Sequence, residues 1–242
     1  MRIFKDFKEA EGEIKRDLKE MGIRVEATRM QDKTGEFPTL ELINYGYTVL
    51  EPAISDLSPS MPWAEVEWGE RRRGAEGNPV NPGKSWTHRE KIWEEFLELN
   101  CQPRPVGDYL SYHEHDHVSM AYTYPERFAT DLKVRRVIHE LKVRPASRQL
   151  YIAMWDPNKD IHRIGDRRVP CSLGWHLMFR ENALHMTYTM RSCDFMTHWH
   201  NDCWLAIRLL EYIASEANVG LGSFCHFINS FHIYERDVAG VF

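Results

Sequence analysis

The sequence predicts one α+β domain, residues 1–242, built on an antiparallel-rich mixed β-sheet with flanking helices. Two apolar and aromatic runs, 173–180 and 183–190, are separated by Glu181-Asn182, which is the pattern of a β-hairpin. Other segments show helical spacing of apolar residues, so the chain contains both strands and helices. No internal repeat, low-complexity tract or linker divides it. We therefore expect a single domain that packs helices against one sheet.

The composition excludes several classes of protein. The 242 residues are 43% hydrophobic and 28% charged, unlike a disordered or collagen-like chain. A formal net charge of −5 supplies no general attraction to nucleic acid or acidic lipid. No apolar run approaches the roughly 20 residues that span a bilayer, and the N-terminal segment does not resemble a signal peptide. The five cysteines form no CxxC pair, which favours a reducing compartment. We expect a cytoplasmic protein without nucleic-acid or membrane partners.

The elements follow in order along the chain. Apolar residues recur at helical spacing over residues 3–21, which predicts an amphipathic helix within an N-terminal helical extension, 1–27. A segment rich in β-branched and aromatic residues begins at Thr39 and ends at Glu51-Pro52, as a strand would. The later predicted elements are a short segment at 63–72 and a helix-like one at 88–99 within long loops over 53–110, a helix at 132–142, a strand at 148–155, a polar loop at 156–168, the hairpin, a helix at 202–216 and a closing strand at 223–234.

Single residues give only weak indications of chemistry. Cys171 follows a proline near several arginines, which suits an activated thiolate, although a buried structural cysteine is the more common case. Arg191-Ser192 could bind a phosphate monoester or form a surface ion pair. Residues 113–117 alternate histidine with carboxylates, but this spacing in an irregular segment is more typical of a solvated loop, and we expect no metal. GxGxxG and P-loop motifs are absent.

Several motifs taken together resemble the thymidylate synthase superfamily. The signature blocks are PC at 170–171, MRSCD at 190–194, HND at 200–202 and FHIY at 231–234. Counted from Cys171, the residues that match the family's functional positions without a gap are Arg191, Asp194, Asp202, His232 and Tyr234. Upstream, RPASRQLYIAMW, YTYPERF and EVEW at 65–68 resemble further family segments. The resemblance covers about residues 28–237.

The resemblance implies a role for each matching residue. Cys171 would be the nucleophile, Glu65 the acid/base residue with Glu67 as the less favoured choice, and Tyr124 the wall of the pocket. Substrate binding would involve the following residues: Arg148, Arg191 and Ser192 at the phosphate, His232 and Tyr234 at the ribose, and Asp202 at the base. Asp194 and Trp68 would lie on the side of the folate. The co-substrate would be 5,10-methylenetetrahydrofolate, with no metal. Family members form homodimers in which the arginine corresponding to Arg148 crosses to the partner's site.

Asp202 suggests which pyrimidine is the substrate. Thymidylate synthases carry Asn at this position, whereas deoxycytidylate hydroxymethylases carry Asp, whose carboxylate accepts from the 4-amino group of cytosine. The flanking words are closest to a phage-type deoxycytidylate hydroxymethylase, which would place the protein in a host-cell cytoplasm. Two alternatives remain: Asn201 could take this position after a one-residue shift, or Asp202 could cap the helix that begins there.

The sequence also departs from the family pattern. Gln149 replaces the second arginine of SRR, and Pro125 replaces the glycine of YTYGER. The chain ends eight residues after Tyr234, without the segment that closes over the folate in thymidylate synthases. This ending suits a reaction that finishes with water.

The sequence thus predicts a deoxypyrimidine nucleotide 5-hydroxymethyltransferase that converts dCMP through a covalent Cys171 adduct. The alternatives are a dUMP hydroxymethylase, a thymidylate synthase that forms dTMP, and a catalytically inactive homologue that binds nucleotides.

Overall fold

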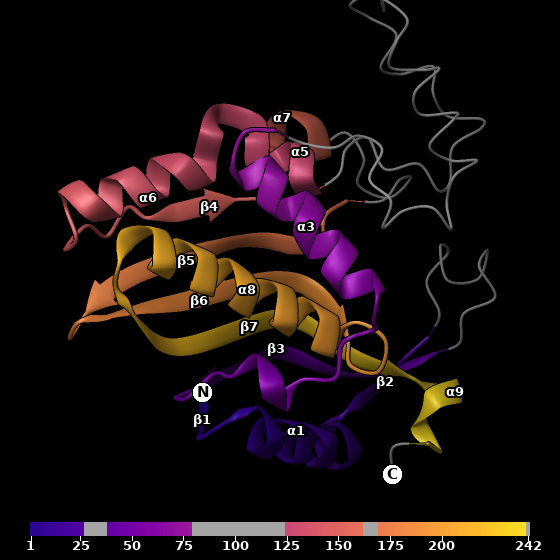
Figure 1. The fold of residues 1–242 in the computed structure, drawn as a ribbon. Helices are drawn as coiled ribbons and strands as arrows, with labels where there is room; N and C mark the ends of the chain where they lie inside the picture. The colour runs from indigo at the N-terminus through magenta and orange to yellow at the C-terminus, as the bar shows by residue number, and fades with distance from the viewer. Residues whose placement is uncertain (27–37, 79–123, 162–168, 241–242) are drawn as a thin grey trace, which may run out of the picture.

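A seven-stranded mixed sheet forms the centre of the computed structural model, which describes residues 1–26, 38–78, 124–161 and 169–240 (Figure 1). The strand order is β1-β3-β7-β6-β5-β4, and β2 pairs with β3 beside β1. The strands are β1 (Arg2–Phe4), β2 (Ile23–Val25), β3 (Thr39–Val49), β4 (Tyr151–Ala153), β5 (Ser172–Arg180), β6 (Ala183–Asp194) and β7 (Gly220–Tyr234). The β1/β3 and β6/β7 pairs are parallel, and the other pairs are antiparallel. The predicted α+β class is confirmed.

The predicted hairpin is strands β5 and β6. Glu181 and Asn182 join them with φ of 51° and 62°, the left-handed values that a tight two-residue hairpin turn requires. Helix α8 (Trp199–Ala217) then returns the chain so that β7 lies parallel to β6. The carboxyl ends of β6 and β7 therefore lie next to the amino end of β5, on the same side of the sheet.

The helices cover the sheet and one another. They are α1 (Phe7–Met21), α3 (Trp63–Ala75), α5 (Tyr124–Ala129), α6 (Lys133–Val143), α7 (Pro157–Asp160), α8 and α9 (Glu235–Val238), with 3₁₀ turns η1 (Ile54–Asp56) and η4 (Thr130–Leu132). Helix α8 contacts β6 and β7 on one side and α3 and α6 on the other (Figure 1). Its eleven buried residues explain why its sequence is apolar on several sides.

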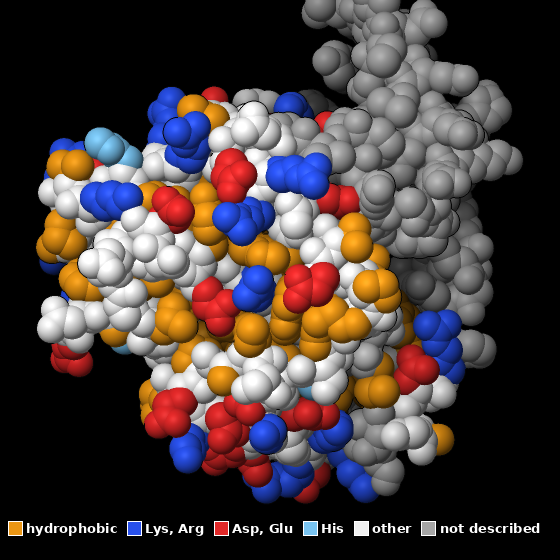
Figure 2. Space-filling view, in the orientation of Figure 1, with side chains coloured by type: hydrophobic (Ala, Val, Ile, Leu, Met, Phe, Trp, Pro, Cys, Tyr) orange, Lys and Arg blue, Asp and Glu red, His pale blue; other side chains and the backbone are white. Residues whose placement is uncertain are grey.

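The N-terminal residues are part of the sheet. The helix predicted at 3–21 begins at Phe7, because the Asp6 side chain accepts a hydrogen bond from the Glu9 N–H and caps it. Strand β1 precedes this helix and β2 follows it. The buried Asp17 carboxylate pairs with Arg2 at 2.7 Å and accepts a hydrogen bond from Tyr45 at 2.6 Å, which ties α1 to β1 and β3. Figure 2 shows the charged side chains gathered over α1, below a band of hydrophobic ones.

The structure corrects one predicted helix start and shows what the short segment at 63–72 is. The helix predicted at 202–216 begins at Trp199, three residues earlier, because the apolar face of the helix already includes Trp199. The short segment at 63–72 is helix α3, in which the buried side chains lie on one face. The helix predicted at 132–142 is confirmed as α6, and the closing strand is confirmed as β7. The segments 88–99 and 113–117 lie outside the described residues.

A row of aromatic side chains crosses the buried face of four neighbouring strands. Tyr47, His226, Tyr188 and Trp175 occupy facing positions on β3, β7, β6 and β5. All four are buried. The row joins the two halves of the sheet beneath α8. Among the described residues, no helix is long and apolar enough to cross a membrane.

Candidate active site

Cys171 immediately precedes β5, next to the carboxyl ends of β6 and β7. Its side chain is half-buried, and the Arg191 Nη2 atom lies 3.5 Å from its sulfur. The same guanidinium donates to the carbonyls of Val169 and Pro170, each at 2.9 Å, and the Arg191 N–H donates to the Cys171 carbonyl at 2.9 Å. A guanidinium held next to a sulfur stabilises the thiolate, which is the nucleophilic form. The geometry therefore suits covalent catalysis.

Tyr124 lies next to this cysteine, at the start of α5. Its hydroxyl accepts a long hydrogen bond of 3.5 Å from the Ser172 N–H, and the Arg71 guanidinium lies 4.6 Å from the centre of its ring. Burial raises the pKa of Tyr124 to about 12, so the phenol stays protonated at neutral pH. Tyr124 thus presents a neutral hydroxyl to the space beside Cys171.

The two glutamates of the EVEW segment face opposite directions on α3. Glu65 is exposed, whereas Glu67 is 1% exposed and its Oε1 atom lies 2.7 Å from the Nε atom of the buried Arg71. Because Arg71 also stacks on Tyr124, the helix brings Glu67 to the side of the predicted site. Trp68 is buried against Tyr212, with the Arg208 guanidinium over its ring, in the contact between α3 and α8.

Asn201 and Asp202 have separate environments. The Asn201 amide accepts a hydrogen bond from the Ser60 N–H at 2.7 Å and donates to the Thr197 carbonyl at 3.0 Å. The Asp202 carboxylate instead lies 3.7 Å from the Cys193 sulfur. Burial raises its pKa, and the Arg71 guanidinium partly opposes this effect. Asp202 lies in the first turn of α8, whose N-cap residue is His198, so the helix-cap interpretation of Asp202 is wrong.

The remaining matched residues come from the ends of β6 and β7. Asp194 faces His232 across the two strands, and Ser192 faces Ser230. The Asp194 Oδ1 atom accepts a hydrogen bond from the Met196 N–H at 3.0 Å, which orients the carboxylate. Burial lowers the pKa of His232, so its ring is neutral at neutral pH. The ring of Tyr234 packs edge-on against it at 5.4 Å.

Arg148 lies apart from this group. It is exposed, and its carbonyl accepts a hydrogen bond from the ring of His176 at 3.0 Å. His176 is five residues along β5 from Cys171, a separation of roughly 16 Å in an extended strand. Arg148 therefore does not contribute to the site of its own chain in this arrangement.

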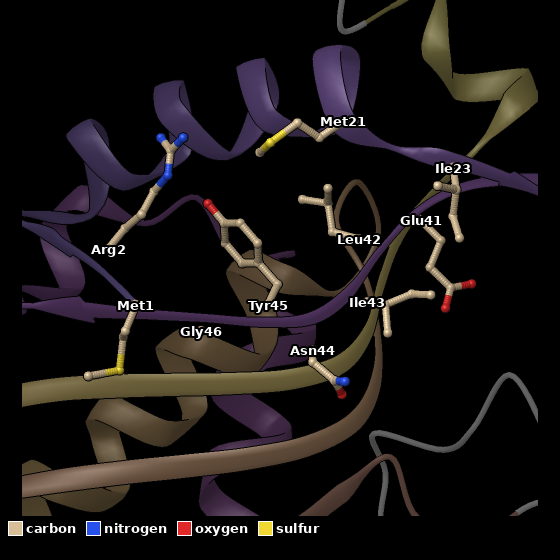
Figure 3. Close-up of a pocket in the computed structure, with 10 residues that line it drawn as sticks. All are labelled: Met1, Arg2, Met21, Ile23, Glu41, Leu42, Ile43, Asn44, Tyr45 and Gly46. Carbon is tan, nitrogen blue, oxygen red and sulfur yellow. The ribbon is translucent and has the colours of Figure 1, made fainter.

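A shallow pocket of about 410 Å³ lies at another edge of the sheet, on β3 between β1 and β2 (Figure 3). Its lining includes Met1, Met21 and Ile43, and none of the residues predicted for the site. In Figure 3 the Arg2 and Tyr45 side chains both point toward α1, where they contact Asp17. We therefore assign no catalytic role to this pocket.

Comparison with known proteins identifies the family. A family model described as thymidylate synthase matches residues 84–241, which is more than half of the chain. The chain belongs to the thymidylate synthase family. Within this family, it is 30% identical over 163 residues to a "Putative thymidylate synthase" of Methanosarcina mazei, covering 65% of this chain and 70% of that one. It is also 30% identical over 126 residues to a protein of the same description in Methanocaldococcus jannaschii, covering 51% and 57%. The matched part thus spans only 57% of that relative's length.

The thymidylate synthase fold extends over nearly the whole chain. Thermostable thymidylate synthase A of Bacillus subtilis matches 98% of this chain and 82% of its own, with a TM-score of 0.66 and 18% identity. Thymidylate synthase of T4 phage matches 96% and 78%, with a TM-score of 0.66 and 16% identity. The family model begins at residue 84, so it does not include α3 and leaves the choice between Glu65 and Glu67 to the structure.

Sequence reasoning did not single out Arg71 and Tyr188, which contact Glu67 and Ser172. An i, i+4 pair of Glu67 and Arg71 was visible in the sequence, but such pairs on a helix are usually exposed. Tyr188 reads as an ordinary strand residue, and only the sheet register brings it under Ser172. Among the described residues, no group of three or more His, Cys, Asp or Glu side chains could hold a metal.

Proposed function

We propose that this protein transfers a one-carbon unit from 5,10-methylenetetrahydrofolate to carbon 5 of a pyrimidine nucleotide, and that dCMP is converted to 5-hydroxymethyl-dCMP. Family membership supports the class of reaction. The observation that supports the choice of base is that the Asn201 amide is occupied by Ser60 and Thr197, whereas the Asp202 carboxylate lies near Cys193 and its charge acts on Tyr124. A carboxylate accepts from the 4-amino group of cytosine and repels the carbonyl of uracil.

The chain's own residues support each chemical step. The Cys171 thiolate, next to Arg191, would add to carbon 6 and make carbon 5 nucleophilic. The folate supplies the one-carbon unit when it is bound, and the Asp194 carboxylate would bind on that side. The Tyr124 hydroxyl, which keeps its own proton, would hydrogen-bond a water that takes up the proton leaving carbon 5 and passes it to solvent. Tetrahydrofolate then leaves as its amine, which gives an exocyclic methylene on carbon 5. Water adds to this methylene to complete the hydroxymethyl group, and expulsion of the Cys171 thiolate restores the ring double bond.

We assign the activation of water to Glu67 in preference to Glu65. Glu65 is exposed on the opposite face of α3, whereas Glu67 is buried beside Arg71 and Tyr124. A general base must lie within hydrogen-bonding reach of the water that it activates, directly or through one further water. Glu67 is connected through Arg71 to the ring of Tyr124, and these contacts are the reason for preferring it.

Arg191 and Ser192 would bind the 5′-phosphate, and His232 and Tyr234 the ribose. Because Arg148 is exposed and lies well away from Cys171, we propose that it serves a second copy of the chain in a homodimer. In that dimer each site would contain residues from two chains.

The product identifies the reaction. The purified protein is incubated with methylenetetrahydrofolate and either dCMP or dUMP, and the nucleotide is analysed by mass spectrometry. We expect a hydroxymethyl nucleotide from dCMP, with tetrahydrofolate released. A Cys171→Ser protein serves as the control and should form no product, because the adduct at carbon 6 cannot form. A methyl nucleotide, or preference for dUMP in the wild type, would contradict the proposal.

The second candidate is a methyl-forming synthase that acts on dUMP. Similarity to proteins described as putative thymidylate synthases supports it. Burial also raises the pKa of Asp202, which favours the neutral carboxyl form that could donate to the uracil carbonyl. This reaction oxidises the folate, so the appearance of dihydrofolate, measured by its absorbance, distinguishes the two candidates.

A further inference from the structure

Cys171 precedes an irregularity in the pairing of β5 with β6. Ser172 faces Met190, but Gly174 faces Thr189, so one extra residue of β5 bulges out between them. A bulge changes the direction of the strand and of the side chains beside it. The direction of the Cys171 side chain therefore depends on what fixes Ser172 and the bulge.

One buried hydrogen bond fixes Ser172 from the helical side of the sheet. The Ser172 Oγ atom lies 2.5 Å from the hydroxyl oxygen of Tyr188, and both residues are almost completely buried. Burial raises the pKa of Tyr188 well above its ordinary value, so the phenol keeps its proton. The phenol is the stronger acid of the two hydroxyls and is therefore the better donor to Ser172.

The aromatic row described above fixes Tyr188 in turn. Its ring stacks on Trp175 at 5.0 Å and 14°, and on His226 at 4.9 Å and 4°. Burial lowers the pKa of His226 to about 3, so this ring is neutral and stacks without a charge. The Tyr47 hydroxyl lies 2.9 Å from the His226 Nδ1 atom and accepts a hydrogen bond from Trp199. Tyr47 lies two strands away from Tyr188, and its contacts do not include Ser172.

We propose that Tyr188 is a positioning residue for the nucleophile. Its hydroxyl holds Ser172 and thereby the bulge, which keeps the Cys171 sulfur beside the Arg191 guanidinium. Ser172 also donates its N–H to Tyr124, so the same contact sets the distance between the thiol and the phenol. This inference rests on the proposed role of Cys171, but it does not depend on which nucleotide is the substrate.

The test compares two Tyr→Phe changes in the same row. Tyr188→Phe keeps the stacked ring and removes only the hydroxyl that holds Ser172. Tyr47→Phe is the matched control, because it also removes one buried hydroxyl, but that hydroxyl contacts His226, Cys203 and Trp199. We expect Tyr188→Phe to lower kcat about five- to tenfold with little change in KM, the effect of losing one hydrogen bond. Tyr47→Phe should leave kcat unchanged, even if it lowers the melting temperature as much as Tyr188→Phe does.

A second readout does not require turnover. Alkylation of Cys171 by iodoacetamide is followed by mass spectrometry of its peptide. Near neutral pH we expect Tyr188→Phe to slow this reaction, because the thiolate loses its cation. Above the ordinary thiol pKa of about 8.5 the two proteins should react alike. If Tyr188→Phe and Tyr47→Phe alkylate and turn over equally, the positioning role is wrong.

Ser172→Ala removes the same hydrogen bond from its other partner and keeps the test valid if Tyr188→Phe does not fold. We expect Ser172→Ala to reproduce the loss, and the double variant to lose no more than either single one, since the two hydroxyls act together. Additive losses would contradict the inference. A wild type that forms no hydroxymethyl nucleotide would overturn the proposed function, and the alkylation comparison would still decide the role of Tyr188.

Discussion

Asn201 and Asp202 are neighbours with different surroundings. Both lie in the first turn of α8, yet one residue of helix turns a side chain by about 100°. Asn201 therefore faces Ser60, and Asp202 faces Cys193. The sequence favoured Asp202 as the base reader and kept Asn201 as the alternative, because residue type alone does not specify the phase of a helix.

Asp202→Asn should change the preferred nucleotide. We expect the ratio of kcat/KM for dCMP over that for dUMP to fall by about 1–3 kcal/mol in free-energy terms, because a buried polar group that loses its partner costs about that much. The ratio is measured for both nucleotides on both proteins, since a damaged pocket would lower both rates. An unchanged ratio would remove the reason for naming dCMP.

Glu67→Gln and Glu65→Gln form a matched pair two residues apart on one helix. Glu67→Gln should lower kcat by roughly 10²–10⁴-fold, because the amide cannot take a proton from water. Glu65→Gln, at the exposed position, should leave kcat within about twofold, as surface changes usually do. Nucleotide binding and the melting temperature are measured alongside, because Glu67→Gln also weakens the buried pair with Arg71. The reverse ranking of the two variants would restore Glu65 as the acid/base residue.

At the scale of the elements, periodic patterns predicted α1, α6, the hairpin and β7, because each buries one regular stripe of side chains. The same kind of pattern did not predict helix α3. Its buried face includes Glu67, Glu70 and Arg71, so no apolar stripe marks it as a helix. The helix that carries a proposed catalytic carboxylate was therefore the hardest to predict.

Two glycines of α3 should respond oppositely to the same substitution. A Cβ atom at Gly74 would lie 2.2 Å from the carbonyl oxygen of Pro125, whereas at Gly69 it would meet nothing within 4 Å. Gly69→Ala should therefore raise the free energy of unfolding by about 0.5–1 kcal/mol, the usual gain from Ala in a helix. Gly74→Ala should lower it and also lower kcat, since Pro125 is next to Tyr124. Urea unfolding and steady-state kinetics check this, and a stabilised Gly74→Ala would show that α3 and α5 are not so closely packed.

For the whole molecule, the family spacing from Cys171 to Tyr234 predicted a group of site residues, several of which lie at neighbouring strand ends. It did not predict how they meet. Their arrangement depends on two parallel strands that end beside the start of an antiparallel one. Arg148 lies outside this spacing and was expected to serve the partner's site, and the fold separates it from the Cys171 of its own chain.

Mixing two inactive proteins tests the shared site. Cys171→Ser lacks the nucleophile and Arg148→Ala lacks the arginine proposed to cross between chains. Neither should be active alone, because each dimer has two identical defects. After subunit exchange, mixed dimers contain one site with both residues intact, so part of the activity should return. Size-exclusion chromatography verifies the dimers, and a mixture that stays inactive after verified exchange would show that Arg148 does not cross.

The outer side of β3, which pairs with β1 along one part and with β2 along another, has a consequence for solubility. Strand β1 runs parallel to it and β2 antiparallel, each over only three residues, and Asn44 between them has a φ of 54°. An incoming strand from another molecule needs a continuous row of backbone donors and acceptors in one direction. Two short strands of opposite direction, separated by a left-handed residue, do not offer one. This border of the sheet is thereby protected against growth into aggregates, at a place where Met1, Ile3, Ile23 and Ile43 are exposed.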